Sequence, residues 1–179
     1  MKKLLTVALA LCILLGLAAC GTSNAPAGTA GNNSNAADNT TPSAPAQDSF
    51  AFEYKGTKIT FHAPAAPIVD ALGEPTKYTE STSCAFDGLD KSYYYGSFYL
   101  DTYPKGDEDF VYGWWFADDT VSTEEGIYIG ATLAEVEKAY GSENYNGTNA
   151  FVIEKADGTL TIILEKDLVN SIQYAIKVD

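Results

Sequence analysis

The chain has no arginine and only one histidine, His62, among its 179 residues. The 11 basic residues are all lysines, and 24 Asp and Glu residues outnumber them, which gives a net charge of −13 at pH 7. Binding of nucleic acid requires clustered Lys and Arg side chains that neutralise phosphates. We therefore expect no nucleic-acid partner.

The sequence motifs of the common enzyme classes are also absent. The chain contains no Gly-x-Ser-x-Gly, His-Glu-x-x-His, phosphate loop or dinucleotide fingerprint. With one histidine and no arginine, few side chains suit acid–base catalysis. We therefore predict neither enzymatic activity nor a cofactor. A hydrolase that uses two carboxylates stays open, because acidic residues are plentiful and such chemistry needs only two carboxyl groups about 5–9 Å apart in a cleft.

The acidic clusters do not have the spacing of a metal site. Asp107-Glu108-Asp109 follows a turn, and Asp118-Asp119 ends a strand-like run. Calcium requires several converging oxygen ligands, and no calcium-loop pattern is present. Both clusters are typical of solvated turns, so no metal site is predicted.

Cysteine is scarce, with three residues at positions 12, 20 and 84. Cys12 and Cys20 lie in the N-terminal segment, so Cys84 alone remains for the rest of the chain and no internal disulfide is possible there. Ala85 and Phe86 follow it, an apolar setting that predicts a buried structural thiol. Nothing in the spacing supports a catalytic pair of Cys84 and His62.

The N-terminus has the parts of a secretory signal. Lys2 and Lys3 precede an apolar run over residues 4–17 that is shorter than the roughly 20 residues of a membrane span. Leu17-Ala18-Ala19-Cys20 resembles a bacterial lipobox, which implies cleavage before Cys20 and transfer of a diacylglycerol to its thiol. We therefore expect a signal peptide over residues 1–19 and a lipid-anchored protein on the outer face of the cell membrane. An ordinary secretory signal is the alternative.

The composition changes at residue 50. Residues 20–49 contain mainly Ala, Asn, Ser, Thr, Gly and Pro, which cannot bury enough apolar surface to fold, and they read as a flexible linker. From residue 50 to residue 179 the chain is rich in Tyr, Phe, Val and Ile, long enough for one domain with its own core.

The folded part contains an internal similarity at a shift of 68 residues. Ile59, Phe61, Ile68, Ala71, Leu72 and Gly73 align with Ile127, Ile129, Val136, Ala139, Tyr140 and Gly141. We expect an α+β fold of two tandem repeats, over about residues 50–121 and 122–179, each with a short helical segment packed on a small antiparallel sheet. Chance similarity between two β-rich halves is the alternative.

Local signals place the elements. A Thr132 cap, Glu135 three residues later and Gly141 predict the limits of the second helix. The first helix is expected between Pro64 and Gly73. Strands are expected over residues 50–54, 57–61, 77–86, 92–103, 109–116, 150–155, 159–165 and 168–178, with hairpin turns at Lys55-Gly56 and Asp157-Gly158.

Two families share short motifs with this chain. Residues 129–136 with Tyr140-Gly141 resemble the G-x-T-x-x-x-V…G element of the β-lactamase-inhibitor-protein-like superfamily. That resemblance implies repeats of a helical segment on a small sheet and binding to other proteins. Residues 83–91, 101–104, 118–121 and 125–127 resemble uncharacterised lipoproteins of Gram-positive bacteria. This resemblance covers most of residues 50–179 and implies no activity.

Aromatic residues are concentrated between residues 93 and 116. If residues 92–103 form one strand, alternation places Tyr93, Tyr95 and Tyr99 on one face, and we expect that face to be exposed. Tyr112 and Trp114 share a face of the next strand. Exposed Tyr and Trp favour binding, so we predict a binding site that comprises Tyr93, Tyr95, Tyr99, Tyr112 and Trp114. Alternatively, these residues are only good strand formers.

These observations together predict a membrane-anchored extracytoplasmic lipoprotein that binds a protein partner without enzymatic activity. A cell-wall or carbohydrate binder is the first alternative, because aromatic rings also stack on sugars. A carboxylate-dependent hydrolase is the second.

Overall fold

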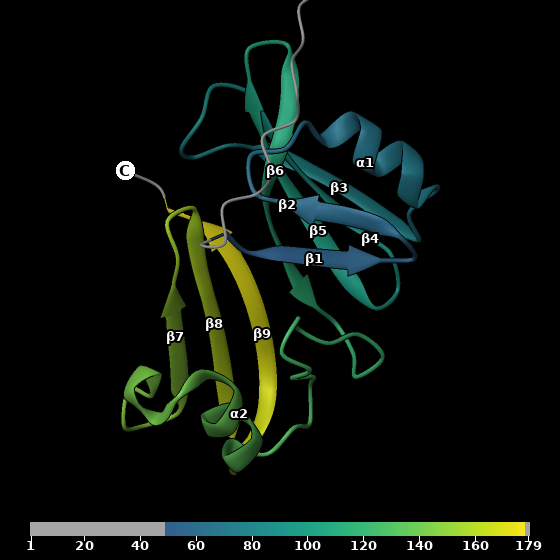
Figure 1. The fold of residues 1–179 in the computed structure, drawn as a ribbon. Helices are drawn as coiled ribbons and strands as arrows, with labels where there is room; N and C mark the ends of the chain where they lie inside the picture. Colours follow the sequence, from purple (N-terminus) through teal and green to yellow (C-terminus); the bar gives the residue numbers. More distant parts are fainter. Residues whose placement is uncertain (1–48, 178–179) are drawn as a thin grey trace, which may run out of the picture. The chain divides into compact units, whose positions relative to one another are not determined.

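A seven-stranded antiparallel sheet is the frame of residues 49–177, the part of the chain that the computed structural model describes. Its strand order is β3-β4-β5-β6-β9-β8-β7, so β6 and β9 join its two halves (Figure 1). The strands are β3 (Lys77–Thr82), β4 (Leu89–Tyr94), β5 (Phe98–Lys105), β6 (Glu108–Phe116), β7 (Ala150–Glu154), β8 (Gly158–Glu165) and β9 (Leu168–Ile176).

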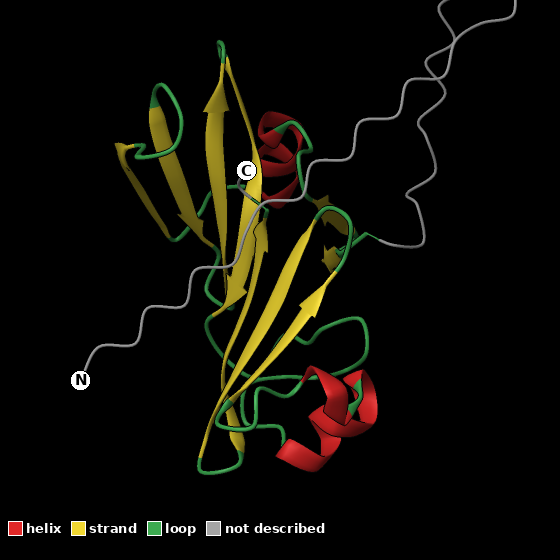
Figure 2. Cartoon of the chain, turned by 90° about the vertical axis from the view of Figure 1, so that its left-hand side faces the viewer, coloured by secondary structure: helices red, strands yellow, loops and turns green. Residues whose placement is uncertain are grey.

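One face of this sheet is covered by a hairpin and two helices. The hairpin comprises β1 (Ala51–Tyr54) and β2 (Thr57–Thr60), and the helices are α1 (Ala65–Leu72) and α2 (Leu133–Tyr140), the latter followed by a short 3-10 turn, η1 (Ser142–Asn144). Both helices lie on the same side of the sheet (Figure 2). The described residues are thus mostly β with two short helices, which agrees with the predicted α+β class.

The hydrophobic core lies between the sheet and these covering elements. Phe52 of the hairpin packs against Phe98 and Phe116 of the sheet at ring-centroid distances of 5.0 and 5.1 Å. Trp114 is fully buried, and its ring centroid lies 4.8 Å from that of Tyr174. Val136 contributes the buried contact of α2. Residues 50–176 supply every member of this core, so the unit Pro42–Asp179 contains a complete core of its own.

The helix ends follow the predicted signals. The Thr132 hydroxyl accepts a hydrogen bond from the Glu135 amide, and the Glu135 carboxylate accepts one from the Thr132 amide at 2.7 Å. This capping box satisfies two amides that would otherwise lack partners. Gly141, with a positive φ of 81°, ends α2.

Each helix is preceded by the same pair of backbone hydrogen bonds to a sheet strand. The His62 amide donates to the Val111 carbonyl and the Val111 amide donates to the Ala63 carbonyl, at 3.0 and 2.9 Å. Before α2, the Gly130 amide donates to the Val169 carbonyl and the Val169 amide donates to the Ala131 carbonyl, both at 2.8 Å. His62 and Gly130 both have positive φ, 58° and 101°. The two helices therefore approach the sheet through similar connections.

The strand prediction for residues 92–103 is wrong. Tyr95-Gly96-Ser97 turns the chain between β4 and β5, and Gly96 has a φ of 92°, which favours glycine. The strand expected over residues 77–86 ends at Thr82, because residues 83–88 form a loop closed by a hydrogen bond from the Ser83 amide to the Gly88 carbonyl.

The first hairpin turn occurs where it was predicted, and the second lies earlier in the chain than the predicted Asp157-Gly158. Lys55-Gly56 joins β1 to β2 with both residues at positive φ, 51° and 82°. The turn between β7 and β8 comprises residues 155–157, and Gly158 is already the first residue of β8.

The predicted signal peptide (residues 1–19), the lipid-bearing Cys20 and nearly all of the linker (residues 20–49) lie outside the described residues. Among residues 49–177, no helix is long and apolar enough to cross a membrane.

Candidate binding face and pocket

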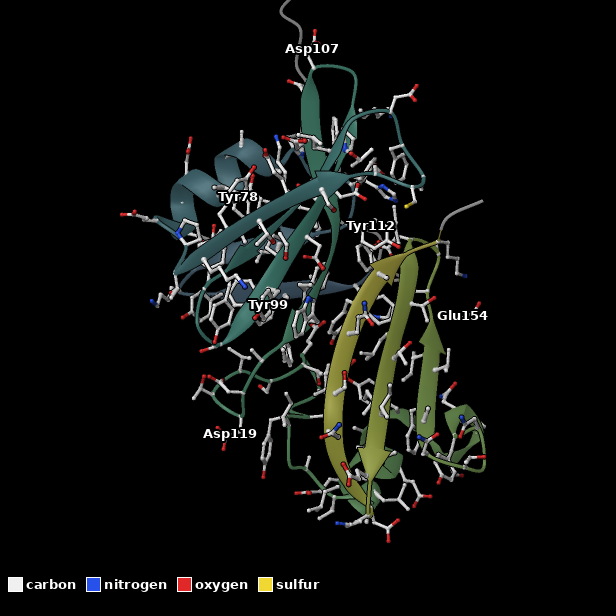
Figure 3. The ribbon with its side chains drawn as sticks, turned by 180° about the vertical axis from the view of Figure 1, so that it is seen from behind. Tyr78, Tyr99, Asp107, Tyr112, Asp119 and Glu154 are labelled. Atoms are coloured by element: carbon white, nitrogen blue, oxygen red, sulfur yellow. The ribbon has the colours of Figure 1, made fainter. Side chains whose placement is uncertain are left out.

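The second face of the large sheet is not covered by a helix or by the hairpin (Figure 3). Its side chains alternate with the core residues along each strand. In β8, Leu160, Ile162 and Leu164 are buried, whereas Thr161 and Ile163 face the other way. We call this second side the open face.

Three aromatic side chains form a stack across β4, β5 and β6 on the open face. The strand register pairs Tyr94 with Tyr99 and Tyr99 with Trp115. Ring centroids are 4.4 Å apart in the first pair and 3.8 Å apart in the second, with interplanar angles of 26° and 2°. All three side chains are partly exposed. We call this set the aromatic ladder.

The ladder presents ring edges more than ring faces. Tyr99 is the central ring, and Tyr94 and Trp115 approach it from the strands on its two sides. Both faces of Tyr99 are therefore occupied, which leaves its edge and hydroxyl group for contacts with a partner. Edges and hydroxyl groups suit contacts with protein side chains and backbone groups.

The row of the ladder continues across the other half of the sheet with smaller side chains. Trp115 pairs with Gln173, Gln173 with Thr161, and Thr161 with Val152. The exposed apolar side chains Val152 and Ile163 lie in this half. The open face therefore combines aromatic, polar and apolar groups in one surface, as protein-binding surfaces do.

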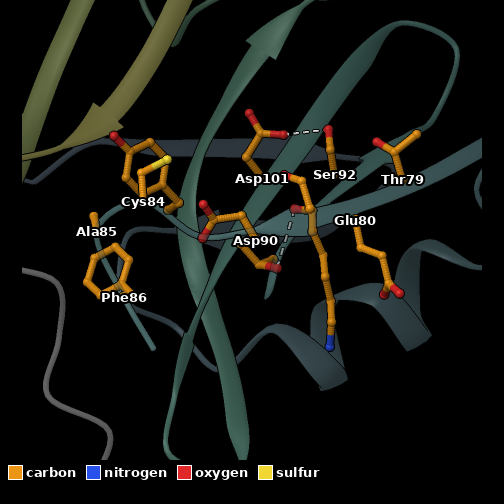
Figure 4. A pocket seen from close by; sticks show the side chains of 12 residues that line it. Thr79, Glu80, Cys84, Ala85, Phe86, Asp90, Ser92 and Asp101 are labelled. Atoms are coloured by element: carbon orange, nitrogen blue, oxygen red, sulfur yellow. Dashed lines mark hydrogen bonds between the residues drawn. The ribbon is translucent and has the colours of Figure 1, made fainter. Parts of the chain in front are cut away.

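A pocket of about 440 Å³ adjoins the ladder, under the loop of residues 83–88 (Figure 4). Ser92 and Asp101 pair across β4 and β5 in the row next to the ladder. The lining residues come from β3 to β6 and from the loop, and they are Thr79, Glu80, Ser81, Cys84, Ala85, Phe86, Asp90, Lys91, Ser92, Asp101, Thr102 and Tyr112.

The loop is held over the sheet by a ring contact and by local hydrogen bonds. The Phe86 ring lies 4.5 Å from the buried Tyr103 ring. The Ser83 hydroxyl oxygen accepts hydrogen bonds from the amides of Ala85 and Phe86. This arrangement fixes Cys84 and Phe86 at the pocket wall.

Asp101 is a partly buried carboxylate of the pocket. The Ser92 hydroxyl donates to it at 2.6 Å. Burial raises the pKa of Asp101, hydrogen bonds from Ser92 and Trp115 oppose the shift, and the negative charge of Asp90 adds to it. Within residues 49–177, no lysine or histidine forms an ion pair with Asp101. Its charge is therefore balanced only by neutral donors.

Of the five predicted aromatic site residues, the structure places only two on the open face or at its pocket. Tyr99 lies in the ladder and Tyr112 lines the pocket. Tyr93 pairs with Leu100 and therefore faces the helix side, where its ring lies 5.1 Å from Tyr78. Its placement on the exposed face was wrong, because the turn after β4 resets the alternation.

The prediction that Tyr95 and Trp114 belong to an exposed binding site is also corrected. Tyr95 lies in the turn, and its hydroxyl group is buried without a hydrogen-bond partner among the described residues. Burial raises the pKa of Tyr95 to about 12. Trp114 has no exposed surface and belongs to the core. Trp114 is therefore not available to a partner, and Tyr95 cannot offer its hydroxyl group to one.

Cys84 was predicted to be buried, but it is exposed at the pocket. The apolar residues after it belong to a loop and not to a strand, so they do not carry the thiol into the core. Tyr94, Trp115 and Asp101 were not predicted as site residues. The glycine at position 96 was the one sequence signal that could have separated β4 from β5 and revealed the ladder.

No three His, Cys, Asp or Glu side chains of the described chain lie close enough together to hold a metal ion. Asp109 of the acidic turn forms an ion pair with Lys91 at 2.5 Å.

No protein-family model, curated protein or solved structure gives a significant match to this chain.

Proposed function

We propose that this protein is a lipid-anchored binding protein on the outer face of the cell membrane, and that its open face binds another protein. The observation that carries the proposal is the aromatic ladder of Tyr94, Tyr99 and Trp115 on a sheet face that no helix or strand of residues 49–177 covers. Tyr and Trp supply much of the energy of protein interfaces at low cost in conformational entropy.

The ring geometry favours a protein partner over a glycan. A sugar stacks on the flat face of an aromatic ring, and the faces of Tyr99 are both occupied by its neighbours. Only the outer faces of the two end rings are left for such stacking. A cell-wall or carbohydrate ligand therefore remains the alternative for the same surface.

Site-specific photocrosslinking on intact cells tests this proposal. A photoreactive residue at the exposed position Gln173, next to Trp115 in the row, should give discrete protein adducts. The same residue at the exposed position Lys138, on α2 and hence on the opposite side of the sheet, is the control and should give none. Adducts that contain glycan and no protein, or equal protein adducts from both positions, would contradict the proposal.

The anchor is tested separately. The resemblance of residues 17–20 to a lipobox supports acylation of Cys20. Cys20→Ala should abolish labelling by a fatty-acid analogue and release the protein from the membrane fraction. Cys12→Ala is the matched control and should leave both unchanged.

A hydrolase is the second candidate, because Asp90 and Asp101 both line the pocket. Two carboxylates in one cavity, one with a raised pKa, are what hydrolysis of a glycosidic bond requires. The two donors that approach Asp101 favour its charged form and weigh against a general acid there. Release of reducing sugars from purified cell wall by the wild type, and not by Asp101→Asn, would support hydrolysis; no release would exclude it for this substrate.

We also infer that the domain is a tandem duplication. At the 68-residue shift, Ala65–Leu72 aligns with Leu133–Tyr140 without a gap. The paired hydrogen bonds before each helix support the equivalence of residues 62–63 with residues 130–131. An experimental structure in which α1 with β5 and β6 fails to superpose on α2 with β8 and β9 would contradict this inference.

A further inference from the structure

The pocket under the loop of residues 83–88 has a polar floor and an apolar wall. Asp101 and Ser92 lie on neighbouring strands of its floor (Figure 4), and Asp90, two residues before Ser92 in β4, also lines the pocket. Ala85 and Phe86 of the loop line it from another side. At about 440 Å³ it falls in the size range of sites that hold a small ligand or a long side chain.

The charge of the pocket is negative and is not neutralised from within. Glu80, Asp90 and Asp101 are its acidic lining residues, and the Glu80 carboxylate accepts a hydrogen bond from the Tyr78 hydroxyl. Lys91 is the only basic lining residue, and its ammonium group is engaged by Asp109, 2.5 Å away. Asp109 is not a lining residue of this pocket. Bringing carboxylates together at a partly buried site is unfavourable unless a cation accompanies them.

The partners of Asp101 leave room for one more donor. An ionised carboxylate accepts up to about four hydrogen bonds, and Asp101 accepts one from the Ser92 hydroxyl, with Trp115 as a second neighbouring donor that lowers its pKa. A charged N–H donor in the pocket would complete this set and offset the buried charge. The apolar side of the pocket, formed by Ala85, Phe86 and Tyr112, would cover a hydrocarbon stem attached to that donor.

We propose that this pocket binds an organic cation, a primary ammonium or guanidinium group carried on an apolar stem, with Asp101 as the main counter-ion. The inference stands on the pocket alone and does not depend on protein binding by the open face. The cation would come either from a free amine or from a Lys or Arg side chain of a peptide.

Hexylammonium and butylguanidinium are suitable probes, with hexanol and hexanoate as neutral and anionic controls. The unit Pro42–Asp179 contains Cys84 as its sole thiol, and Cys84 lies at the pocket. The rate of Cys84 alkylation therefore reports occupancy, and NMR titration gives the affinity. The cations should slow alkylation in a saturable manner and bind at least about tenfold more tightly than hexanol.

Two matched substitutions test the role of charge. Asp101→Asn keeps the size of the side chain and should weaken cation binding about tenfold or more. Asp119→Asn removes one negative charge at an exposed position outside the pocket and should leave binding within about twofold. Circular dichroism checks that each variant is folded, and Asp90→Asn replaces Asp101→Asn if the latter is not.

Equal binding of hexanol and hexylammonium, equal losses in the Asp101 and Asp119 variants, or no saturable binding of either cation would overturn the proposal. Tighter binding of a neutral cell-wall saccharide than of either cation would also overturn it. Comparison of free agmatine with an acetylated, amidated Ala-Lys-Ala peptide separates the two sources. Preference for the peptide identifies a side chain of a protein partner as the cation, and preference for agmatine identifies a free amine.

Discussion

The indole of Trp115 lies parallel to the phenol ring of Tyr99, with 3.8 Å between the ring centroids and 2° between the ring planes. The two residues are paired across β5 and β6. Trp114, the neighbour of Trp115 in sequence, points to the other side and is fully buried. Two adjacent tryptophans therefore have different roles, one in the open face and one in the core.

Tyr99→Ala should abolish partner binding while the fold persists. Removing the central ring separates Tyr94 from Trp115, and an interface aromatic of this kind contributes about 2 kcal/mol or more to binding. Loss of cross-strand ring contacts should lower the free energy of unfolding by only about 0.5–1.5 kcal/mol. Crosslinking yield from position 173 and urea denaturation measure the two effects. If stability fell by as much as in a core variant, the ladder would be structural.

Trp114→Ala should destabilise the unit strongly. Its ring contacts Phe61 and Tyr174 at 4.8 Å each, and such a truncation costs about 3–5 kcal/mol. Trp114→Phe is the matched control. The buried Trp114 Nε1 has no hydrogen-bond partner among the described residues, so phenylalanine removes an unsatisfied donor and should retain most of the stability. Thermal denaturation of both variants gives the comparison, and an equal loss in both would contradict it.

Gly113→Ala should weaken the junction of the two sheet halves. A methyl group at this position would meet the backbone carbonyl of Tyr174 on the paired strand β9. Backbone cannot yield as a flexible side chain can, so β6 and β9 must separate locally, at a cost of about 1–3 kcal/mol. Ser171→Ala, a substitution elsewhere on β9, should stay within about 0.5 kcal/mol of the wild type. Chemical denaturation that gave the two variants equal stability would contradict this account.

The unfavourable contribution of Asp101 to the stability of the folded unit should decrease as the pH falls. Burial raises its pKa in the folded state above the unfolded value, so the folded state binds the proton more tightly. The cost of the buried charge is fully present above the folded pKa and is lost as the pH falls through it.

Asp101→Asn lacks this charge at every pH. The stability advantage of the variant over the wild type at pH 7 should therefore shrink as the pH falls toward about 4. Asp118 and Glu135, whose pKa values are lowered by hydrogen bonds, are common to both proteins and cancel in the comparison. Urea denaturation at each pH measures the difference. A difference that grows with acidity would show that Asp101 is stabilised as a carboxylate.

Local signals in the sequence were sufficient for the first hairpin turn and the helix ends. Lys55-Gly56 turns the first hairpin, and Thr132, Glu135 and Gly141 limit α2, because each acts through the backbone of its immediate neighbours. Such interactions do not depend on the rest of the fold.

The faces of the aromatic strands could not be predicted in the same way. A single turn at residues 95–97 resets the alternation, so Tyr93 and Tyr99 lie on opposite faces. The pocket depends on pairing between β4, β5 and β6, which is not local, and on a loop that brings Cys84 to the open face. No short stretch of sequence contains those contacts.

The junction between β6 and β9 has a consequence for the time course of folding. Only three residue pairs join these strands, Gly113 with Ala175, Trp114 with Tyr174, and Trp115 with Gln173. All other neighbours in the large sheet are strands consecutive in sequence, which can form early as hairpins. The β6–β9 pairing must close a loop of about sixty residues, so its formation should come last and limit the rate. Substitutions at this junction should then slow refolding, whereas substitutions at the outer hairpins should mainly accelerate unfolding.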